Sequence, residues 1–237
     1  MTWYREWFGE EYLDLYSYRD EEEARHHVAF FQEHVGAVRG TLLDLACGSG
    51  RHLQEFGLAG YSAIGCDLSF ILLRNAVRQS GTSRVVRADM RSLPFCDASF
   101  AALVSFFTSF GYFEHEEENA IVIREMCRVL SRDAPVLFDY LNVHRELRGL
   151  VQKETRDTDA GVIEIERWFD AASRTFNKRI TIAGKRFLER VRGYDLDEIS
   201  ALFAANGLGI RQVYGDFDAA PFDEKSPRLI VIGIKRR

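Results

Sequence analysis

The stretch Thr41-Leu-Leu-Asp-Leu-Ala-Cys-Gly-Ser-Gly-Arg-His52 is the segment from which we interpret the rest of the chain. Its first five residues, Thr41–Leu45, are mostly leucine, which is typical of a buried parallel strand. The small residues that follow permit a sharp turn into a helix that begins near Arg51. A ligand can approach the backbone closely at Gly48 and Gly50, where free amides attract an anionic group. That group is either a cofactor's pyrophosphate or the carboxylate of an amino-acid moiety.

Three features favour the amino-acid moiety. The fingerprint for nicotinamide dinucleotides needs a further glycine three positions after Gly50, where this chain has Leu53. Asp44 lies at the strand end before the glycines, where it can meet a cationic amino group. Asp67 closes the next expected strand, Ala63–Asp67, about 20 residues further on, where ribose hydroxyls are expected.

At these residues the chain resembles the class I S-adenosylmethionine-dependent methyltransferases, whose motif runs acid-x-Gly-x-Gly-x-Gly. Here the motif reads Asp44-Leu-Ala-Cys-Gly-Ser-Gly50, with Ala46 in place of the first glycine. The resemblance implies S-adenosylmethionine as the cofactor, with an acid and an apolar residue after the third strand at the adenine and an N-terminal arginine at the donor carboxylate. The cofactor-binding residues expected on this basis are Tyr16, Arg19, Asp44, Ala46, Gly48, Gly50, Asp67, Leu68, Asp89, Met90 and Ser105.

The pattern of apolar runs, together with this resemblance, predicts an α/β fold: a Rossmann-like, seven-stranded, mostly parallel sheet with helices on both faces and a small antiparallel β insert. The sheet strands are expected at Thr41–Leu45, Ala63–Asp67, Ser83–Ala88, Phe100–Phe106, Ala134–Tyr140, Leu208–Tyr214 and Leu229–Ile234. Three further runs alternate with period two and predict an antiparallel meander: Val162–Trp168, Thr175–Ile182 and Lys185–Val191. The cofactor-binding domain then comprises residues 41–141 and 193–237, and the insert comprises residues 142–192.

Residues 1–40 are interpreted as an N-terminal helical lid segment. Residues 3–19 are rich in aromatics, and Phe8, Tyr12 and Tyr16 recur at helical spacing. One interpretation is a helix that simply packs on the main domain. The other, which the resemblance supports, is a lid that covers the donor and helps to form the acceptor pocket.

Composition and charge exclude several classes of protein. The 237 residues, with 46% hydrophobic and 28% charged, are typical of an ordinary water-soluble domain. A net charge of −5 argues against general nucleic-acid binding. The four cysteines are far apart and the six histidines do not pair with acids at ligand spacing, so we expect neither a metal site nor disulfides. No segment is apolar and long enough for a membrane span or a signal peptide, and we expect a cytoplasmic protein.

The acceptor site is less clearly encoded. After the fourth strand, nucleic-acid amino methyltransferases carry Asn/Asp-Pro-Pro-aromatic, whereas this chain resembles the Ser-Phe-Gly-Tyr variant of small-molecule enzymes, with Ser109 and Tyr112 bordering the reacting methyl. A hydroxyl acceptor would need a general base. His115 and His144 follow core strands and are candidates, so Tyr112, His115 and His144 form the expected catalytic set.

We therefore predict an S-adenosylmethionine-dependent methyltransferase that moves a methyl group to a nitrogen or oxygen of a small molecule by direct displacement. Two alternatives stay open: a nicotinamide-dependent oxidoreductase on a similar sheet, and a donor-binding protein without catalysis. The insert is expected either to roof the acceptor pocket or to form a homodimer contact. Its basic residues are either a solvated face or a rim for an anionic acceptor.

Overall fold

The computed structural model describes residues 3–16, 21–80, 84–158 and 161–236. Its larger sheet has seven strands in the order β10-β11-β5-β4-β1-β2-β3. Their bounds are β1 Thr41–Leu45, β2 Ser62–Asp67, β3 Val85–Arg87, β4 Ala102–Ser105, β5 Pro135–Leu141, β10 Leu208–Tyr214 and β11 Arg228–Lys235. Strand β11 pairs antiparallel with both neighbours, β5 and β10, whereas β1 to β5 pair in parallel. The predicted fold class is confirmed.

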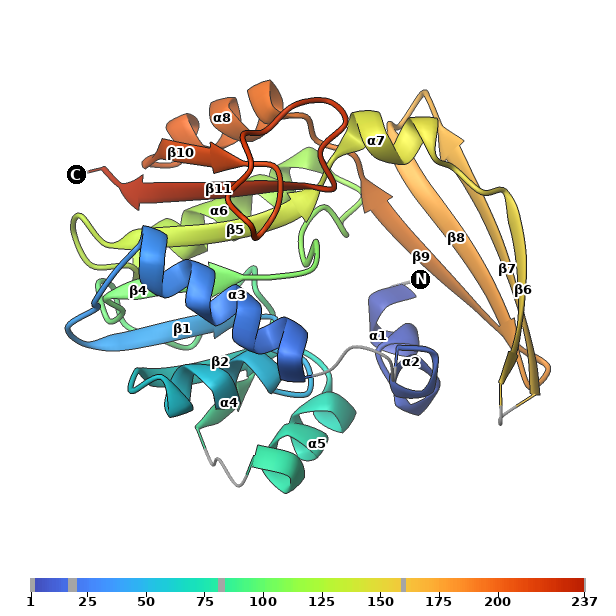
Figure 1. The fold of residues 1–237 in the computed structure, drawn as a ribbon, viewed down its shortest axis with the longest axis horizontal. Coiled ribbons are helices and arrows are strands. Elements are labelled where there is room, and N and C mark those ends of the chain that lie inside the picture. Colours follow the sequence, from blue (N-terminus) through green and yellow to red (C-terminus); the bar gives the residue numbers. More distant parts are fainter. Residues whose placement is uncertain (1–2, 17–20, 81–83, 159–160, 237) are drawn as a thin grey trace.

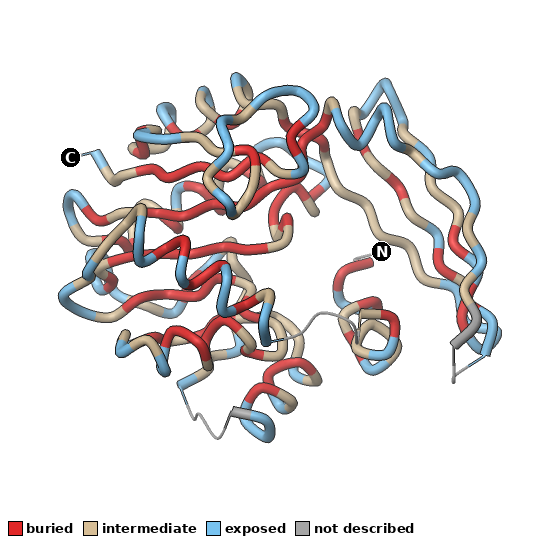
Figure 2. The backbone as a smooth tube through the Cα atoms, viewed as in Figure 1, coloured by how far each residue is buried: buried red, intermediate tan, exposed pale blue. Residues whose placement is uncertain are grey.

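Helices cover both faces of this sheet because successive side chains of its strands point in opposite directions (Figures 1 and 2). The helices are α3 Glu21–His34, α4 Arg51–Leu58, α5 Phe70–Ser80, α6 Glu116–Val129 and α8 Leu196–Ala205. Leu42 packs in one core cluster with residues of α3 and α4. Its neighbour Leu43 packs in the other cluster, with residues of α6 and α8. The alternation also fixes the side of the sheet on which Asp44 lies.

The insert is a second, four-stranded antiparallel sheet in the order β6-β7-β8-β9. Its strands are β6 Lys153–Thr158, β7 Gly161–Asp170, β8 Thr175–Ile182 and β9 Lys185–Arg192, and the short helix α7 Val143–Arg148 precedes them. The meander of three strands was predicted, but β6 and α7 were not. The sequence of β6, Lys-Glu-Thr-Arg-Asp-Thr, has no apolar alternation that would reveal a strand.

The N-terminal segment forms two short helices, α1 Trp3–Trp7 and α2 Glu10–Leu15, where the residue spacing had suggested one. Gly9 interrupts them in an extended conformation. The pair lies between the two sheets (Figure 1). Trp7 is completely buried, and its ring centroid is 5.0 Å from that of Phe187 in β9. The expected donor residue Arg19 lies outside the described residues.

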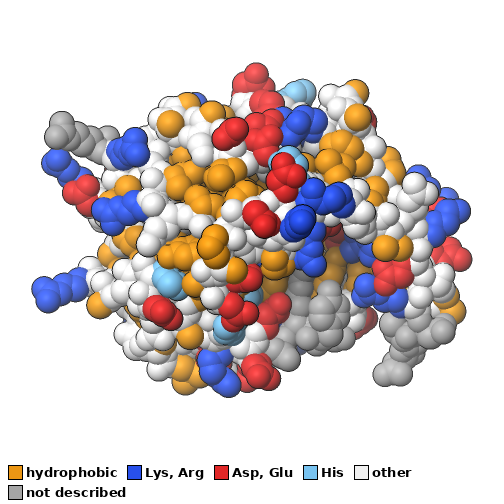
Figure 3. Space-filling view, turned by 45° about the horizontal axis from the view of Figure 1, so that its top comes forward, with side chains coloured by type: hydrophobic (Ala, Val, Ile, Leu, Met, Phe, Trp, Pro, Cys, Tyr) orange, Lys and Arg blue, Asp and Glu red, His pale blue; other side chains and the backbone are white. Residues whose placement is uncertain are grey.

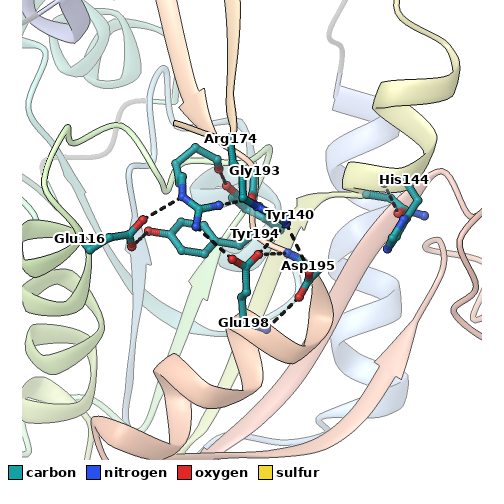
Figure 4. A network of polar contacts seen from close by, with 10 residues as sticks. Glu116, Tyr140, His144, Arg174, Gly193, Tyr194, Asp195 and Glu198 are labelled. Carbon is teal, nitrogen blue, oxygen red and sulfur yellow. Dashed lines mark hydrogen bonds and ion pairs between the residues drawn. The ribbon is translucent and has the colours of Figure 1, made fainter. Parts of the chain in front are cut away.

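A polar network fixes the point where the chain returns from the insert to the main sheet (Figure 4). The Arg192 guanidinium binds Glu116 of α6 at 2.8 Å and Glu198 of α8 at 3.0 Å. The Tyr194 hydroxyl also donates to Glu116, and the Tyr140 hydroxyl of β5 donates to the carbonyl oxygen of Arg192. Strand β9 is therefore tied to helices on the main domain.

Candidate functional site

A cavity of about 350 Å³ lies at the carboxyl ends of the parallel strands, where ligands gather in such sheets. The expected site residues that line it are Tyr16, Asp44, Ala46, Gly48, Asp67, Leu68, Asp89, Met90, Ser109 and Tyr112. Residues that are far apart along the chain and were expected at one site thus line one cavity. Gly50, Ser105, His115 and His144 are not among the lining residues.

The glycine-rich turn contributes residues 46–49 to the cavity lining, and Gly50 directly follows them in the chain. Gly48 and Gly50 have φ angles of 54° and 80°, which glycine adopts without strain. Gly50 precedes the first residue of α4, and a Cβ atom there would lie 2.9 Å from the Cβ of Ala76 in α5. Ala46, which replaces the family's first glycine, also has a positive φ, 61°. The turn therefore keeps its shape with one strained residue.

Asp44 is the most unusual group in the wall. Its side chain is 2% exposed, and its Oδ2 atom has no hydrogen-bond partner. Burial raises the pKa of Asp44 to about 7, the negative charge of Asp67 adds to the rise, and Arg51 opposes it. Of the four buried side-chain atoms without a partner in the described chain, Asp44 Oδ2 alone belongs to a residue that lines this cavity. Such an orphaned carboxylate oxygen fits a cationic group of a ligand.

Asp67 is held at the end of β2 by two backbone amides. Gly48 donates to its Oδ2 at 2.9 Å and Ser69 donates to its Oδ1 at 2.8 Å. Burial raises the pKa of Asp67, and these amides act against the rise. These two hydrogen bonds fix the orientation of a carboxylate that belongs to the cavity lining, and its other lone pairs can accept further hydrogen bonds.

Asp89 is already paired on its own side of the cavity. Arg91 binds it at 2.6 Å through Nη2 and at 3.0 Å through Nε. Burial by itself would raise the pKa of Asp89, but the hydrogen bonds from Arg91 outweigh that effect and the pKa falls below its usual value. Asp89 therefore faces the cavity as a carboxylate, beside the apolar side chain of Met90.

Aromatic side chains close the opposite side. The Tyr112 ring stacks on Phe8 with centroids 5.8 Å apart, and meets the Trp3 ring edge-on at 4.9 Å. Tyr4, Phe8, Leu13 and further residues of the N-terminal segment line the cavity. The segment therefore packs on the core and also forms part of the cavity lining. Its role as a lid over the donor stays a prediction.

Three residues that were expected at the site, Ser105, His115 and His144, lie outside the cavity lining. Ser105 is 3% exposed within β4, and the alternation of that strand brings Phe106 to the cavity instead. His115 is exposed at the start of α6. His144 lies on α7, to one side of the polar network in Figure 4, and lines a separate small hollow with Tyr194. Neither histidine is placed to act as a base in the cavity.

Two other histidines were missed. His52 lines the cavity, and its Nε2 lies 3.0 Å from Nδ1 of His27 in α3. Both are buried, and the His52 ring stacks on Phe106 at 3.9 Å. Burial lowers the pKa of His27 to about 3, helped by the positive charge of nearby groups. The signal in the sequence was weak. His27 lies on the apolar face of an expected helix, and His52 comes two residues after the glycine motif.

The turn after β4 was also not anticipated. Phe107 and Thr108 both adopt positive φ angles, 58° and 61°, beside the cavity. Asp139, buried within β5, accepts a hydrogen bond from the Phe107 amide at 2.7 Å, and Arg228 of β11 binds Asp139 at 2.7 Å. Arg228 also donates to the Thr108 hydroxyl at 2.9 Å. The one hint in the sequence was Asp139, an acid in the otherwise apolar strand β5.

The described ranges also bear on metal binding and membrane insertion. No cluster of three or more His, Cys, Asp or Glu side chains there could hold a metal ion. None of the helices in those ranges has the length and apolar character needed to cross a membrane.

Comparison with known proteins identifies several relatives. A family model described as a methyltransferase domain matches residues 42–133. The chain is 30% identical over 206 residues to "Putative methyltransferase YqeM" of Bacillus subtilis (strain 168), covering 81% of this chain and 82% of that protein. It is 40% identical over 102 residues to a demethylmenaquinone methyltransferase of Thermobifida fusca (strain YX), covering 40% of this chain and 41% of the relative.

A third relative acts on an amino sugar by its name, dTDP-3-amino-3,4,6-trideoxy-alpha-D-glucopyranose N,N-dimethyltransferase of Streptomyces venezuelae. It is 36% identical over 99 residues, covering 42% of this chain and 41% of that protein. The matches to this relative and to the Thermobifida protein thus span less than half of each relative. Among solved structures, an S-adenosylmethionine-dependent methyltransferase from Clostridium acetobutylicum ATCC 824 has a TM-score of 0.80 at 16% identity, covering 95% of this chain and 96% of that chain.

Proposed function

Because the chain belongs to the S-adenosylmethionine-dependent methyltransferases, we propose that it transfers a methyl group to the nitrogen of a free small molecule, with oxygen as the second candidate. The observation that carries the donor assignment in this structure is the orphaned Asp44 carboxylate beside the glycine turn. The relative named as an amino-sugar N,N-dimethyltransferase supports a small amine as the acceptor.

The residues of the cavity fit the donor. We propose that Asp44 accepts hydrogen bonds from its amino group, that Asp67 accepts from its ribose hydroxyls, and that Leu68 and Met90 contact the adenine. Asp89 would accept a hydrogen bond from the adenine amino group, and it would keep its bonds to Arg91 at the same time. When bound, S-adenosylmethionine supplies a methyl group on a cationic sulfur, which is already activated for displacement.

Since the donor is activated, the protein mainly aligns the two reactants and excludes water. The aromatic wall of Tyr4, Phe8, Tyr12 and Tyr112 is suited to both tasks. Its ring faces also attract positive charge, whether on the donor's sulfur or on an ammonium product. Phe8 and Tyr112 fix each other by stacking, so this wall has a defined shape.

A nitrogen acceptor is favoured because it requires less of the protein. A hydroxyl must lose its proton as it attacks, which calls for a base within hydrogen-bond reach. His115 and His144 lie outside the cavity wall, and His52 is engaged with His27. A neutral amine can attack before it loses a proton, because the product is a stable ammonium ion, so alignment by the aromatic wall suffices.

A screen of small molecules with methyl-labelled donor tests this function. Primary and secondary amines are compared with the matching alcohols, and any hit is repeated with Tyr112→Ala and Tyr112→Phe. We expect label on an amine, a large loss of turnover in Tyr112→Ala, and near-normal turnover in Tyr112→Phe because the ring contacts persist. Label on RNA or protein, with no small molecule modified, would refute the acceptor proposal and leave the donor site intact.

We also propose that the insert carries a contact with a second copy of the chain. In the described residues β6 pairs with β7 on one side, and its other backbone edge has no strand partner. Light scattering should give twice the chain mass of 27.2 kDa; the mass of one chain at every concentration tested would exclude this contact. The four cysteines are free thiols, which supports a reducing cytoplasm.

A further inference from the structure

The insert presents a charged pair to the N-terminal segment. Lys178 of β8 and Glu189 of β9 are cross-strand partners, and their Nζ and Oε2 atoms are 3.3 Å apart. Their side chains are only 15% and 18% exposed. The next residue of β8, Arg179, points to the other face of the sheet, where it pairs with Glu166 at 2.6 Å and is half exposed. One strand thus carries a covered ion pair and an open one side by side.

The covered pair contacts two aromatic residues of the N-terminal segment. The Trp7 indole donates to Glu189 Oε1 at 2.5 Å, and the Tyr16 hydroxyl donates to the same oxygen at 3.2 Å. The Lys178 ammonium donates to the Tyr16 hydroxyl and lies 4.8 Å from the centre of its ring. Tyr16 in turn lines the donor cavity, whereas neither Lys178 nor Glu189 does.

These hydrogen bonds fix the orientation of the N-terminal segment more closely than apolar packing alone would. Apolar contacts such as that between Trp7 and Phe187 hold the segment against β9 without fixing its orientation. A mostly buried ion pair is costly unless all of its hydrogen-bonding groups are satisfied, so the positions of Trp7 and Tyr16 are tied to those of the two charges. Burial lowers the pKa of Lys178, and Glu189 opposes that shift.

We propose that Lys178 and Glu189 are positioning residues of the donor site: from the insert, they hold Tyr16 and Trp7 so that the N-terminal segment stays closed against the cavity. The insert then serves donor binding without touching the donor. This inference depends on the donor site and is independent of the identity of the acceptor.

Two measurements on the full chain test it. Calorimetry with S-adenosylhomocysteine compares Lys178→Met, Glu189→Ala and Glu189→Gln with the matched control Arg179→Met. If the closed segment becomes about ten times less populated, the measured affinity falls about tenfold. We expect this loss in Lys178→Met and Glu189→Ala. Glu189→Gln should recover most of the affinity, because its amide oxygen can still accept from Trp7 and Tyr16, and Arg179→Met should match the unmutated chain.

Hydrogen exchange without ligand provides the second measurement, and it is informative even if the unmutated chain fails to bind the nucleoside. Amides of residues 3–16 should exchange at least tenfold faster in Lys178→Met and Glu189→Ala, while those of β1 and β4 stay unchanged. The proposal is wrong if exchange in residues 3–16 is unaffected, if affinity is unchanged while the chain stays folded, or if Arg179→Met has the same effects.

Discussion

Ala46 has a left-handed backbone conformation, with φ of 61°, at the start of the glycine turn. For a residue with a Cβ atom this conformation costs about 1–2 kcal/mol, and glycine avoids the cost at the price of a more flexible unfolded chain. We expect Ala46→Gly to raise the free energy of unfolding by about 0.5–1 kcal/mol. Urea denaturation measures this difference.

The control is Ala120→Gly within helix α6, where glycine should lower the free energy of unfolding by about 1 kcal/mol. A loss of stability in both variants would contradict the strain assigned to Ala46.

Asp44 should make the stability of the ligand-free chain depend on pH. Its pKa is about 7 in the folded chain and 3.8 in the unfolded chain, so the folded state binds more protons between these values. The contribution of Asp44 to stability is therefore greatest at low pH and is lost as pH rises from about 4 to 7. Asp44→Asn removes this trend, and its stability relative to the unmutated chain should rise by up to about 4 kcal/mol over that range. Denaturation at several pH values tests the sign.

Donor binding should show the matching effect. The cationic amino group favours ionised Asp44, so affinity should weaken as pH falls below about 7. Calorimetry at pH 6 and pH 8 measures it. Equal affinity at both values would show that Asp44 does not meet the amino group.

His27 should act in the opposite direction. Its pKa is about 3 in the folded chain and 6.5 in the unfolded chain, so it contributes stability above 6.5 that is lost as pH falls toward 3. In His27→Gln this acid loss should disappear. Denaturation at pH 5 and pH 7 separates the two groups, because the Asp44 variant and the His27 variant must change the slope with opposite signs.

At the scale of single residues, the sequence predicted those site residues that lie at the carboxyl end of a strand of the parallel sheet or directly after it. Asp44 and Asp67 were expected at one site because parallel strands bring their carboxyl ends to one edge, whereas Met90 was expected there from the resemblance to the methyltransferase family. The contact between His27 and His52 joins two helices, and nothing local encodes it. The path of the backbone after β4, through Phe107 and Thr108, likewise could not be predicted from the local sequence.

At the scale of elements, the turn after β4 is held in place by side chains of two other strands, Asp139 of β5 and Arg228 of β11. Asp139 is 1% exposed, and Arg228 is its cationic partner. Removing one member of a buried pair leaves a charge without compensation, so Arg228→Met should cost about 3 kcal/mol of stability and should weaken donor binding. The turn at Phe107 and Thr108 would lose its support.

A double variant supplies the control. In Arg228→Met with Asp139→Asn, the buried charge is absent while an amide oxygen can still accept from the Phe107 amide. At least about 1 kcal/mol should return relative to Arg228→Met alone. A strictly additive loss would show that the two side chains do not act as a pair.

Elements with strong apolar periodicity could be predicted, and those defined by their neighbours could not. The strands of the large sheet and the meander of the insert follow from their sequence patterns. Strand β6 exists because β7 offers it a pairing edge, and its own residues are polar. The N-terminal helix is divided at Gly9, where the segment turns between the two sheets.

Over the whole molecule, the insert and the main sheet enclose the N-terminal segment. Basic and acidic side chains are intermixed at the insert end of the molecule (Figure 3). Of the eight basic residues between positions 167 and 192, seven have a carboxylate partner within 4.0 Å. Basic side chains that are largely neutralised in this way offer little attraction to an anionic acceptor, which argues against the interpretation of the insert as a cationic rim.

The central claim is that the cavity at the carboxyl ends of the strands is the donor site, and the most direct test is calorimetric titration with S-adenosylhomocysteine. Asp67→Ala should bind about 10–100-fold more weakly, because a hydrogen bond to a charged group contributes about 1.5–3 kcal/mol. Asp218→Ala, at an exposed carboxylate outside the cavity, should bind like the unmutated chain. Unchanged affinity in Asp67→Ala, or preferential binding of NADH by the unmutated chain, would contradict the claim.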